Sequence, residues 1–358
     1  MSTSSRIAAS PALAIRPAPK PVHEFPGLRA LAWQQDLLFA SHAYTLLCAN
    51  MSCEVPEWQT VGFFRPAWWR NLTASAGLSS RLFRDGFHAL AALASGHFIA
   101  AAPGAIVSLM PGETEFRVSH SIQRGTRPLH ITATPDGKVF WGEYFDNRDR
   151  DEVHIYVSPD RGLTWEVGYT FPKGGVRHVH NIVYDEWEDC LWILTGDEGA
   201  ECRILRASTD FRAVNVVLAG GQQARAVALV PLRDAIYFAT DTPLEQNHIY
   251  RLGRNGSLVK VADIDSSSIC GCRAGTSIFF SIMAEPSRVN SSRTVKLYRS
   301  HDGERWEEFL HWRKDVWSMR LFQYGNAFLP DGQNTTDLLA TSTVAVSGAD
   351  LKTTLWRI

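Results

Sequence analysis

The densest group of chemically active residues in the sequence is the stretch Gly175–Asn181, which reads GVRHVHN. It brings together Arg177, His178 and His180. Two histidines one residue apart in an extended segment lie on the same side of the strand, because side chains alternate with a period of two. Imidazole exchanges a proton near neutral pH and is also a common metal ligand. The stretch is therefore a candidate for acid–base catalysis or for metal binding.

Other residues of the same chemical types stand at the ends of short apolar segments. His180 is a candidate general base, Tyr144 is a candidate acid, and Arg177 and Arg225 can hold a substrate carboxylate. Such a set suits β-elimination from a uronic acid. A pair of carboxyl groups ~5–10 Å apart would instead suit glycoside hydrolysis. The remaining catalytic candidates are His178 and the possible hydrolytic pair Asp197 and Asp241, and the remaining substrate-binding candidates are Glu143, Glu285, Arg320 and Trp317.

The elements that must position these residues are short β-strands. Runs such as KVFWGEYF and CLWILTGD are rich in β-branched and aromatic residues and are bounded by Gly, Asp and Asn. A unit of strand, tight turn and second strand recurs at intervals of 42 to 60 residues, and its anchors are Leu28, His88, His130, His180, Arg225, Cys270 and Met319. This period matches that of propeller blades. We expect an all-β chain with a flexible tail at residues 1–24 and a single β-propeller at 25–358, with seven four-stranded blades and with six or eight as alternatives.

The repeat also predicts where the candidate residues meet. In a propeller, the innermost strands begin at one face of the channel, where the loops between second and third strands also lie. His88, His130 and His180 hold corresponding positions in three consecutive units, and three converging imidazoles can bind Zn, Mn or Fe. A divalent metal is the one possible cofactor, since the phosphate-binding glycine motifs are missing. Each histidine or carboxylate also has a structural alternative, as a hydrogen-bonded channel residue.

One motif points to a family. The stretch Ser158–Trp165, SPDRGLTW, has the form Ser-x-Asp-x-Gly-x-Thr-Trp, and shorter copies occur at Ser300–Trp306 and Ser208–Phe211. The chain resembles the Asp-box, or BNR-repeat, propellers of the sialidase-like superfamily. The resemblance implies that these stretches are structural turns away from the active face, with Trp165 packed against its own blade. The Phe/Tyr-Arg-Ile-Pro motif of sialidases does not occur, so sialidase activity itself is not expected.

Composition narrows the class of partner. The formal net charge of -1 argues against a general nucleic-acid binder, and no apolar run reaches the ~18 residues that span a bilayer. The N-terminus lacks the apolar region of a secretory signal, so a cytoplasmic location is expected. The leading hypothesis is a carbohydrate-active enzyme that cleaves a glycosidic bond of an acidic oligosaccharide or polysaccharide, as a lyase or a glycosidase. The alternatives are a non-catalytic binding or assembly propeller and a His-ligated metalloenzyme.

The C-terminal segment TTLWRI is expected to close the ring. An open propeller would expose two unpaired strand edges, which favour aggregation. The partner of this segment must therefore come from the N-terminal part of the chain, near Leu28 or before it.

Overall fold

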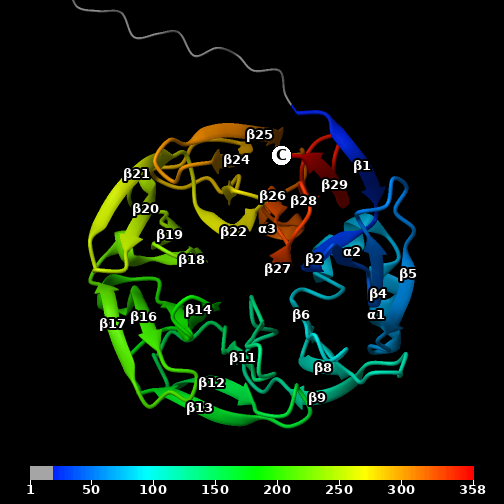
Figure 1. The fold of residues 1–358 in the computed structure, drawn as a ribbon, viewed down its shortest axis with the longest axis horizontal. Helices are drawn as coiled ribbons and strands as arrows, with labels where there is room; N and C mark the ends of the chain where they lie inside the picture. The colour runs from blue at the N-terminus through cyan, green and yellow to red at the C-terminus, as the bar shows by residue number, and fades with distance from the viewer. Residues whose placement is uncertain (1–18) are drawn as a thin grey trace, which may run out of the picture.

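The computed structural model describes residues 19–358 as a ring of seven sheets around a central channel (Figure 1). The fold is a seven-bladed β-propeller, which confirms the predicted fold class. The blades, from the innermost strand outwards, are β2 (Arg29–Gln35), β3 (Leu37–His42), β4 (Thr45–Asn50) and β5 (Gln59–Phe63); β6 (Leu90–Ala92), β7 (Phe98–Ala102), β8 (Ala105–Leu109) and β9 (Arg117–Ser121); β10 (Thr132–Ala133), β11 (Val139–Gly142), β12 (Val153–Ser158) and β13 (Glu166–Phe171); β14 (Val179–Asp185), β15 (Cys190–Thr195), β16 (Arg203–Ala207) and β17 (Val214–Ala219); β18 (Ala226–Pro231), β19 (Ala235–Thr240), β20 (Asn247–Gly253) and β21 (Leu258–Ile264); β22 (Ser268–Ala274), β23 (Ser277–Ile282), β24 (Thr294–Ser300) and β25 (Glu307–Arg313); and β26 (Asn326–Phe328), β28 (Leu338–Val344), β29 (Lys352–Arg357) and β1 (Pro21–Pro26).

The last blade joins the two ends of the chain. Its outermost strand, β1, pairs antiparallel with the C-terminal strand β29, as the closure argument predicts. The expected tail at 1–24 needs correction at its end, because residues 21–24 already belong to this sheet, while residues 1–18 lie outside the described part of the chain. Prolines bound β1 at both ends, and an edge strand tolerates proline because one row of its N–H groups needs no partner. The prolines of this segment therefore led to the prediction of a tail where the structure has the strand β1.

The core lies between the blades. The second strand of a blade packs against neighbouring sheets on both faces, so its side chains are buried without alternation, as in β15, β19 and β23. Phe238 and Phe280, from two of these strands, are fully buried. Burial on both faces explains why these segments read as continuous apolar runs rather than as alternating ones.

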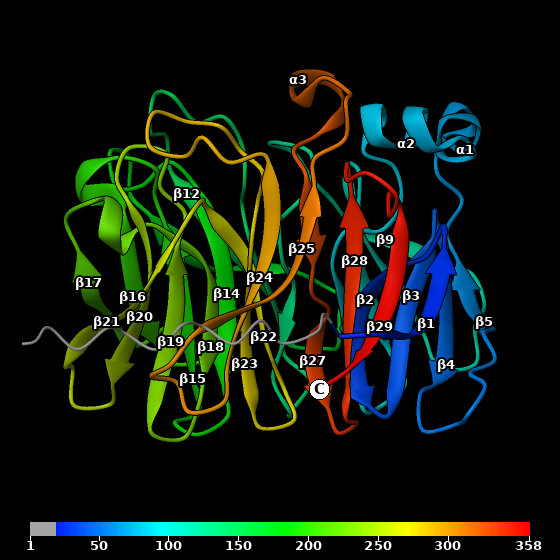
Figure 2. The same cartoon turned by 90° about the horizontal axis from the view of Figure 1, so that it is seen from above.

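Three helices lie together on one face of the ring (Figure 2). They are α1 (Trp68–Ala74), α2 (Gly77–Phe83) and α3 (Met319–Phe322), and two 3-10 turns, η1 (Gly199–Glu201) and η2 (Gln222–Ala224), precede β16 and β18. The first two helices account for the long interval between the first two repeat anchors. Met319 was expected to begin an innermost strand, but it begins α3, and the strand β26 starts only at Asn326. No helix among residues 19–358 is long and apolar enough to cross a membrane.

The SPDRGLTW stretch forms a compact turn between β12 and β13. The Asp160 carboxylate accepts hydrogen bonds from the backbone N–H and the hydroxyl of Thr164, and Gly162 has φ +88°, which favours glycine. Trp165 is only half-buried, and its indole N–H donates to the Ser119 hydroxyl of β9 at 3.0 Å. The ring contacts Trp141 of its own blade, as the motif predicts, but the prediction that it is buried there is wrong, and its N–H reaches the preceding blade. Strands alternate in direction, so this turn lies at the end of the blade opposite to the start of the innermost strand.

The chain has one more pairing that the repeat does not predict. Strand β27 (Asp331–Asn334) follows β26 and adds to the first blade, where it lies parallel to β2. The first and last blades are therefore connected twice, by the pairing of β27 with β2 at the channel and by the pairing of β1 with β29 at the outer edge.

Candidate functional site

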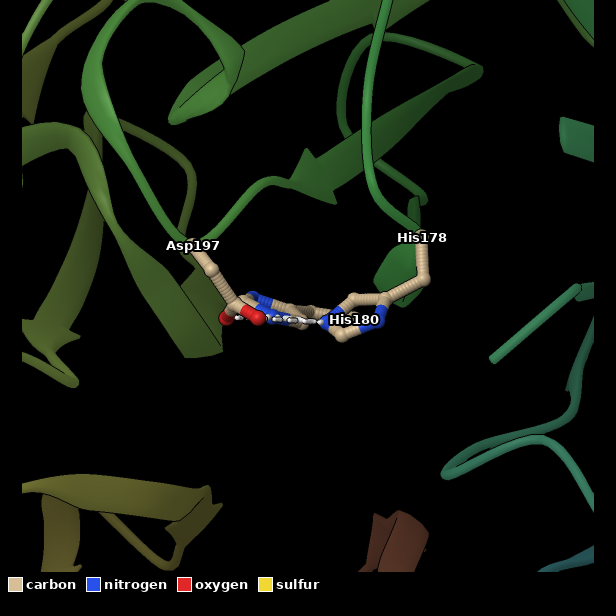
Figure 3. A group of neighbouring side chains, drawn as sticks. All are labelled: His178, His180 and Asp197. Carbon is tan, nitrogen blue, oxygen red and sulfur yellow. Dashed lines mark hydrogen bonds and ion pairs between the residues drawn. The ribbon is translucent and has the colours of Figure 1, made fainter. Parts of the chain in front are cut away.

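The two histidines of the GVRHVHN stretch come from the start of β14, at the mouth of the channel. The pairing of β14 with β15 shifts register between Val179 and Asn181, so that His180 is an extra residue in the strand. Such a bulge re-aims side chains. His178 and His180 both turn toward Asp197, which lies on the loop between β15 and β16 (Figure 3).

A glycine shapes the loop that carries Asp197. Gly196 has φ +96°, and a Cβ atom at this position would lie 2.1 Å from the carbonyl oxygen of Glu201. The chain can therefore turn this tightly only with glycine. Gln222 of the next blade fixes the loop from outside, because its side-chain amide donates to the carbonyl of Asp197 at 2.9 Å.

The three side chains meet at short distances. The Nε2 atoms of His178 and His180 are 3.0 Å apart. The Asp197 carboxylate lies 3.3 Å from Nε2 of His180 and 3.5 Å from Nε2 of His178. Both imidazoles are buried, with 5% and 3% of their surface exposed, while Asp197 is less enclosed. The group therefore sits at the boundary between the core and the open mouth.

The hydrogen-bond partners decide which ring nitrogens carry hydrogen. Nδ1 of His178 lies 3.1 Å from the carbonyl oxygen of Phe145, and Nδ1 of His180 lies 3.0 Å from that of Ala226. A carbonyl only accepts, so each Nδ1 must donate, and Nε2 of each neutral ring carries a lone pair. Two lone pairs and a carboxylate would thus face one another. Such an arrangement is stable when a cation, either a proton or a metal ion, lies among them.

The spacing of this group suits a metal ion. Ligand atoms ~2.1 Å from a common metal are ~3.0 Å apart at octahedral angles and ~3.4 Å apart at tetrahedral angles. The two Nε2 atoms are 3.0 Å apart, and each lies 3.3 or 3.5 Å from a different oxygen of Asp197, so the separations are close to this range. Metal-bound histidines usually donate their other ring N–H to a carbonyl or a carboxylate, as both do in this site. Two histidines and one carboxylate are a ligand set for Zn or Fe.

The metal set expected from the repeat is different and is not assembled. His88 accepts from the Arg29 guanidinium at 3.0 Å, and His130 lies 3.4 Å from the carboxylate of Asp331. Neither belongs to a cluster of metal-ligating atoms among residues 19–358. Corresponding positions of successive blades are related by rotation about the channel, so their side chains spread around the mouth. The ligands that converge come from one strand and its own blade.

The charged residues expected at the mouth surround Asp197. Arg177 and Arg225 each place a guanidinium nitrogen 3.2 Å from its carboxylate, and Arg225 also lies 3.3 Å from Asp241. Burial alone would raise the pKa of Asp197. Hydrogen bonds from His178 and His180, which require a proton on the histidine pair, and the positive charge of Arg225 outweigh this effect and hold the pKa well below its usual range. The carboxylate is therefore ionised at neutral pH.

Burial has the opposite effect on the neighbouring titratable groups. It lowers the pKa of His178, so the ring is uncharged at neutral pH. It raises the pKa of Asp241, and burial together with the Asp241 charge raises the pKa of Glu285 to about 7. The Tyr144 ring lies 4.3 Å from the His178 ring. Burial also raises the pKa of the Tyr144 hydroxyl. Glu285, expected only to bind substrate, is thus a carboxyl group that can exchange a proton near neutral pH.

Three substrate-binding candidates lie outside this cluster. Both carboxylate oxygens of Glu143 accept from the guanidinium of Arg124, and one of them also accepts from the backbone N–H of His154, so this buried residue is structural. Trp317 packs against Phe322 of α3, and Arg320 is exposed on the same helix. The repeat pattern placed Trp317 and Arg320 at the channel mouth because it predicted a strand where the structure has a helix.

In a second cluster of possible metal ligands, the carboxylates are already paired with an arginine. Asp185, Glu188 and Cys190 lie near the far end of β14. Arg254 pairs with both carboxylates of this cluster, and burial raises the pKa of the Cys190 thiol. An arginine thus occupies the place that a cation would take.

Comparisons with known proteins inform the fold. No protein-family model matches the chain, and no curated protein sequence matches it. A chain of the Mitotic Checkpoint Complex is similar over 99% of this chain and 99% of its own length, with a TM-score of 0.58 and 9% identity. The computationally designed Ika8 protein is similar over 93% and 96%, with a TM-score of 0.51 and 10% identity. A puromycin hydrolase is similar over 89% of this chain and 53% of its own, with a TM-score of 0.54 and 11% identity. At identities this low, the similarity shows the fold alone.

Proposed function

We propose that this protein is an enzyme that cleaves an acidic saccharide at the channel mouth, around a divalent metal ion held by His178, His180 and Asp197. One observation carries the proposal: both Nδ1 atoms lie at hydrogen-bond distance from backbone carbonyls, so the two Nε2 atoms face each other and the Asp197 carboxylate, and a proton or a metal ion must lie among them. Such a group attracts a cation. A metal bound there supplies a Lewis acid that polarises an oxygen of the substrate.

The surrounding charges favour an acidic substrate. Arg177 and Arg225 carry two positive charges against the negative charges of Asp197 and Asp241, so a divalent ion would make this group of residues net positive. The Nε atoms of both arginines are buried and have no hydrogen-bond partner among the described residues. A carboxylate that reaches these guanidinium groups would gain charge-assisted hydrogen bonds. A uronic acid has such a carboxylate.

The reaction that these groups support best is β-elimination. A base removes the proton from the carbon next to the carboxylate, a carbon–carbon double bond forms, and the glycosidic carbon–oxygen bond breaks. The departing oxygen then takes a proton. With the imidazoles held as ligands, Glu285 is the candidate base, since its pKa lies near 7, and Tyr144 is the candidate acid.

A second candidate is the same cleavage without a metal. The specific observation in its favour is that Arg177 and Arg225 already neutralise Asp197. His180 would then be the base and Tyr144 the acid in an elimination. Alternatively, Asp197 and Asp241 would form the pair that hydrolysis needs, since their environments shift the two pKa values in opposite directions, that of Asp197 downwards and that of Asp241 upwards.

Metal content and a saccharide screen separate these candidates. The metal bound by the purified protein is measured by mass spectrometry, before and after treatment with a chelator. Acidic saccharides are then screened by the ultraviolet absorbance of an unsaturated uronate and by new reducing ends. We expect His178→Ala to lose both the metal and the activity. His311→Ala is the matched control, because His311 is exposed and pairs with Glu308 far from the cluster.

Each outcome has a distinct reading. Cleavage that survives removal of the metal would overturn the metal proposal and support the second candidate. Bound metal without cleavage of any acidic saccharide would contradict the enzymatic proposal and favour a binding or assembly propeller.

A further inference from the structure

A second group of charged residues lies on the other side of the channel from β14, where β2 and β6 begin (Figure 1). It contains three arginines and one histidine from different segments. Arg29 begins β2, Arg84 ends α2, His88 precedes β6, and Arg127 lies between β9 and β10. We call these four residues the arginine cluster.

Contacts within the arginine cluster are direct. Arg29 donates to Nδ1 of His88 at 3.0 Å and to the His88 carbonyl at 3.3 Å, while Arg127 donates to the carbonyl of Arg84 at 3.0 Å. An arginine always donates, so Nδ1 of His88 accepts and its Nε2 carries the hydrogen. The Arg29 guanidinium also lies 4.2 Å above the Phe328 ring. Every polar side-chain group of the cluster other than that acceptor is thus a hydrogen-bond donor.

The arginine cluster has no carboxylate in direct contact among the described residues, although the charge of Asp331 acts on Arg29 at longer range. Among residues 19–358, no carboxylate oxygen lies within 4 Å of Arg29, Arg84 or Arg127 in an ion pair, although the chain forms many such pairs elsewhere. The neighbouring Asp85 is taken by Arg70 at 2.9 Å and by the Tyr44 hydroxyl at 2.8 Å. The Nε atom of Arg29 is buried without a partner. Arg84 is exposed, whereas Arg29 and Arg127 are partly buried. A partly buried charge without a paired anion is costly, so these two residues favour binding of an anion.

The titration of these groups agrees with the geometry. Burial, together with Arg29 and Arg84, lowers the pKa of Arg127 to about 9, and burial lowers the pKa of Arg29 to about 10. Burial and the three arginines also hold the pKa of His88 well below its usual value. The like charges therefore act on one another at close range.

A cavity opens beside the arginine cluster. It has a volume of about 260 Å³, and its lining includes Arg29, Arg84 and His88, the hydroxyls of Ser41 and Ser342, and Asp85, whose charge is paired with Arg70. Arg127 lies behind Arg84, to whose carbonyl it donates, and is not part of the lining. Small-molecule sites usually measure ~300–1,000 Å³, so this cavity suits a small anion or one end of a ligand.

We propose that the arginine cluster binds a phosphate group, either inorganic phosphate or the phosphate ester of a small molecule. The guanidinium groups of Arg29 and Arg84 reach the cavity from different segments, Arg127 adds a third positive charge beside Arg84, and a tetrahedral group with three or four oxygens can accept from several directions. A carboxylate has two oxygens in one plane and a single charge, so it would leave part of the cluster unpaired. The site lies apart from the histidine pair of β14 and does not depend on the function proposed for that pair.

Isothermal titration with inorganic phosphate tests this proposal on the full chain. A chelator removes any metal, and sodium chloride keeps the ionic strength constant. We expect saturable binding of one phosphate, and a dissociation constant at least ~10-fold weaker in Arg84→Gln and in Arg127→Gln, since each variant removes one positive charge from the cluster. Arg212→Gln is the matched control, because Arg212 is exposed and pairs with Asp210 in a different turn.

Further titrations identify which anion binds and at which site it binds. Sulfate has the same shape and should compete with phosphate, whereas acetate should bind at least ~10-fold more weakly. A free phosphate site would prefer inorganic phosphate to glycerol phosphate, and an ester site would show the reverse preference. Arg225→Gln should leave phosphate binding unchanged. The proposal fails if phosphate gives no saturable binding, if acetate binds as tightly, or if Arg225→Gln rather than Arg84→Gln abolishes binding. A rise in melting temperature with phosphate, but not with sodium chloride, provides a second measurement on the unaltered protein.

Discussion

Replacing Asp197 by asparagine tests the metal centre most directly. The change keeps the shape of the side chain and removes one negative charge at the point where the two Nε2 atoms converge. A unit charge and a divalent ion ~4 Å apart attract by ~8 kcal/mol at an effective dielectric constant near 20, and much of this is offset by the loss of hydration. We therefore expect Asp197→Asn to weaken metal binding by at least ~100-fold, or ~2.8 kcal/mol.

The assay is a titration of the metal-free protein with zinc, manganese and iron(II), followed by calorimetry or by competition with a chelator. Asp146→Asn is the matched control. Asp146 also pairs with Arg177, but its side chain is exposed and lies outside the ligand cluster, so its loss should change metal affinity by less than ~3-fold because exposed charges are screened. Equal metal affinity in the parent protein and in Asp197→Asn would refute the assignment. Equal losses in both variants would show that only the overall charge matters.

Two further predictions concern stability. Glu285 has a pKa of about 7 in the folded chain against 4.5 for an ordinary glutamate, so its effect lowers stability as pH rises from 4.5 to 7. We expect Glu285→Gln to be ~1–2 kcal/mol more stable than the parent at pH 8, after allowance for the partial exposure of the side chain, and no more stable at pH 4. The free energy of unfolding is measured with urea at both pH values. An equal difference between the two proteins at pH 4 and pH 8 would contradict this prediction. Trp165→Ala should cost ~2–3 kcal/mol, less than a fully buried tryptophan, because half-buried packing and one hydrogen bond to Ser119 are lost. Trp187→Ala, at an exposed turn, should cost less than ~1 kcal/mol, and similar melting temperatures for both variants would argue against the bridging role.

The number and the positions of the blades follow from the local sequence. Strand, turn and strand recur at an interval that only a few architectures share, and turn residues mark each boundary. Six of the seven anchors lie within two residues of an innermost strand as the structure has it. The exception is Met319, because the segment Met319–Phe322 folds into a helix whose residues carry no strong helix signal over so short a length.

The period of a strand predicts from the sequence that His178 and His180 lie on one side, but in the structure a bulge at His180 sets the direction of the pair. Their acidic partner was identified as a candidate of the same face, since the loop after β15 must reach the same mouth. Neither conclusion needs knowledge of distant contacts.

The partner of each polar group is decided only by the tertiary structure. Glu143 and Asp197 are both acidic residues that follow the second strand of a blade, yet Arg124 takes up the first and the histidine pair faces the second. His88 and His180 align in the repeat, but the ring of His88 accepts a hydrogen bond from an arginine of another blade, whereas the ring of His180 donates one to a backbone carbonyl. The hydrogen-bond partners come from residues 46 to 59 positions away in the chain. Local periodicity sets the direction of a side chain, whereas the packing of neighbouring blades sets its charge, its tautomer and therefore its chemistry.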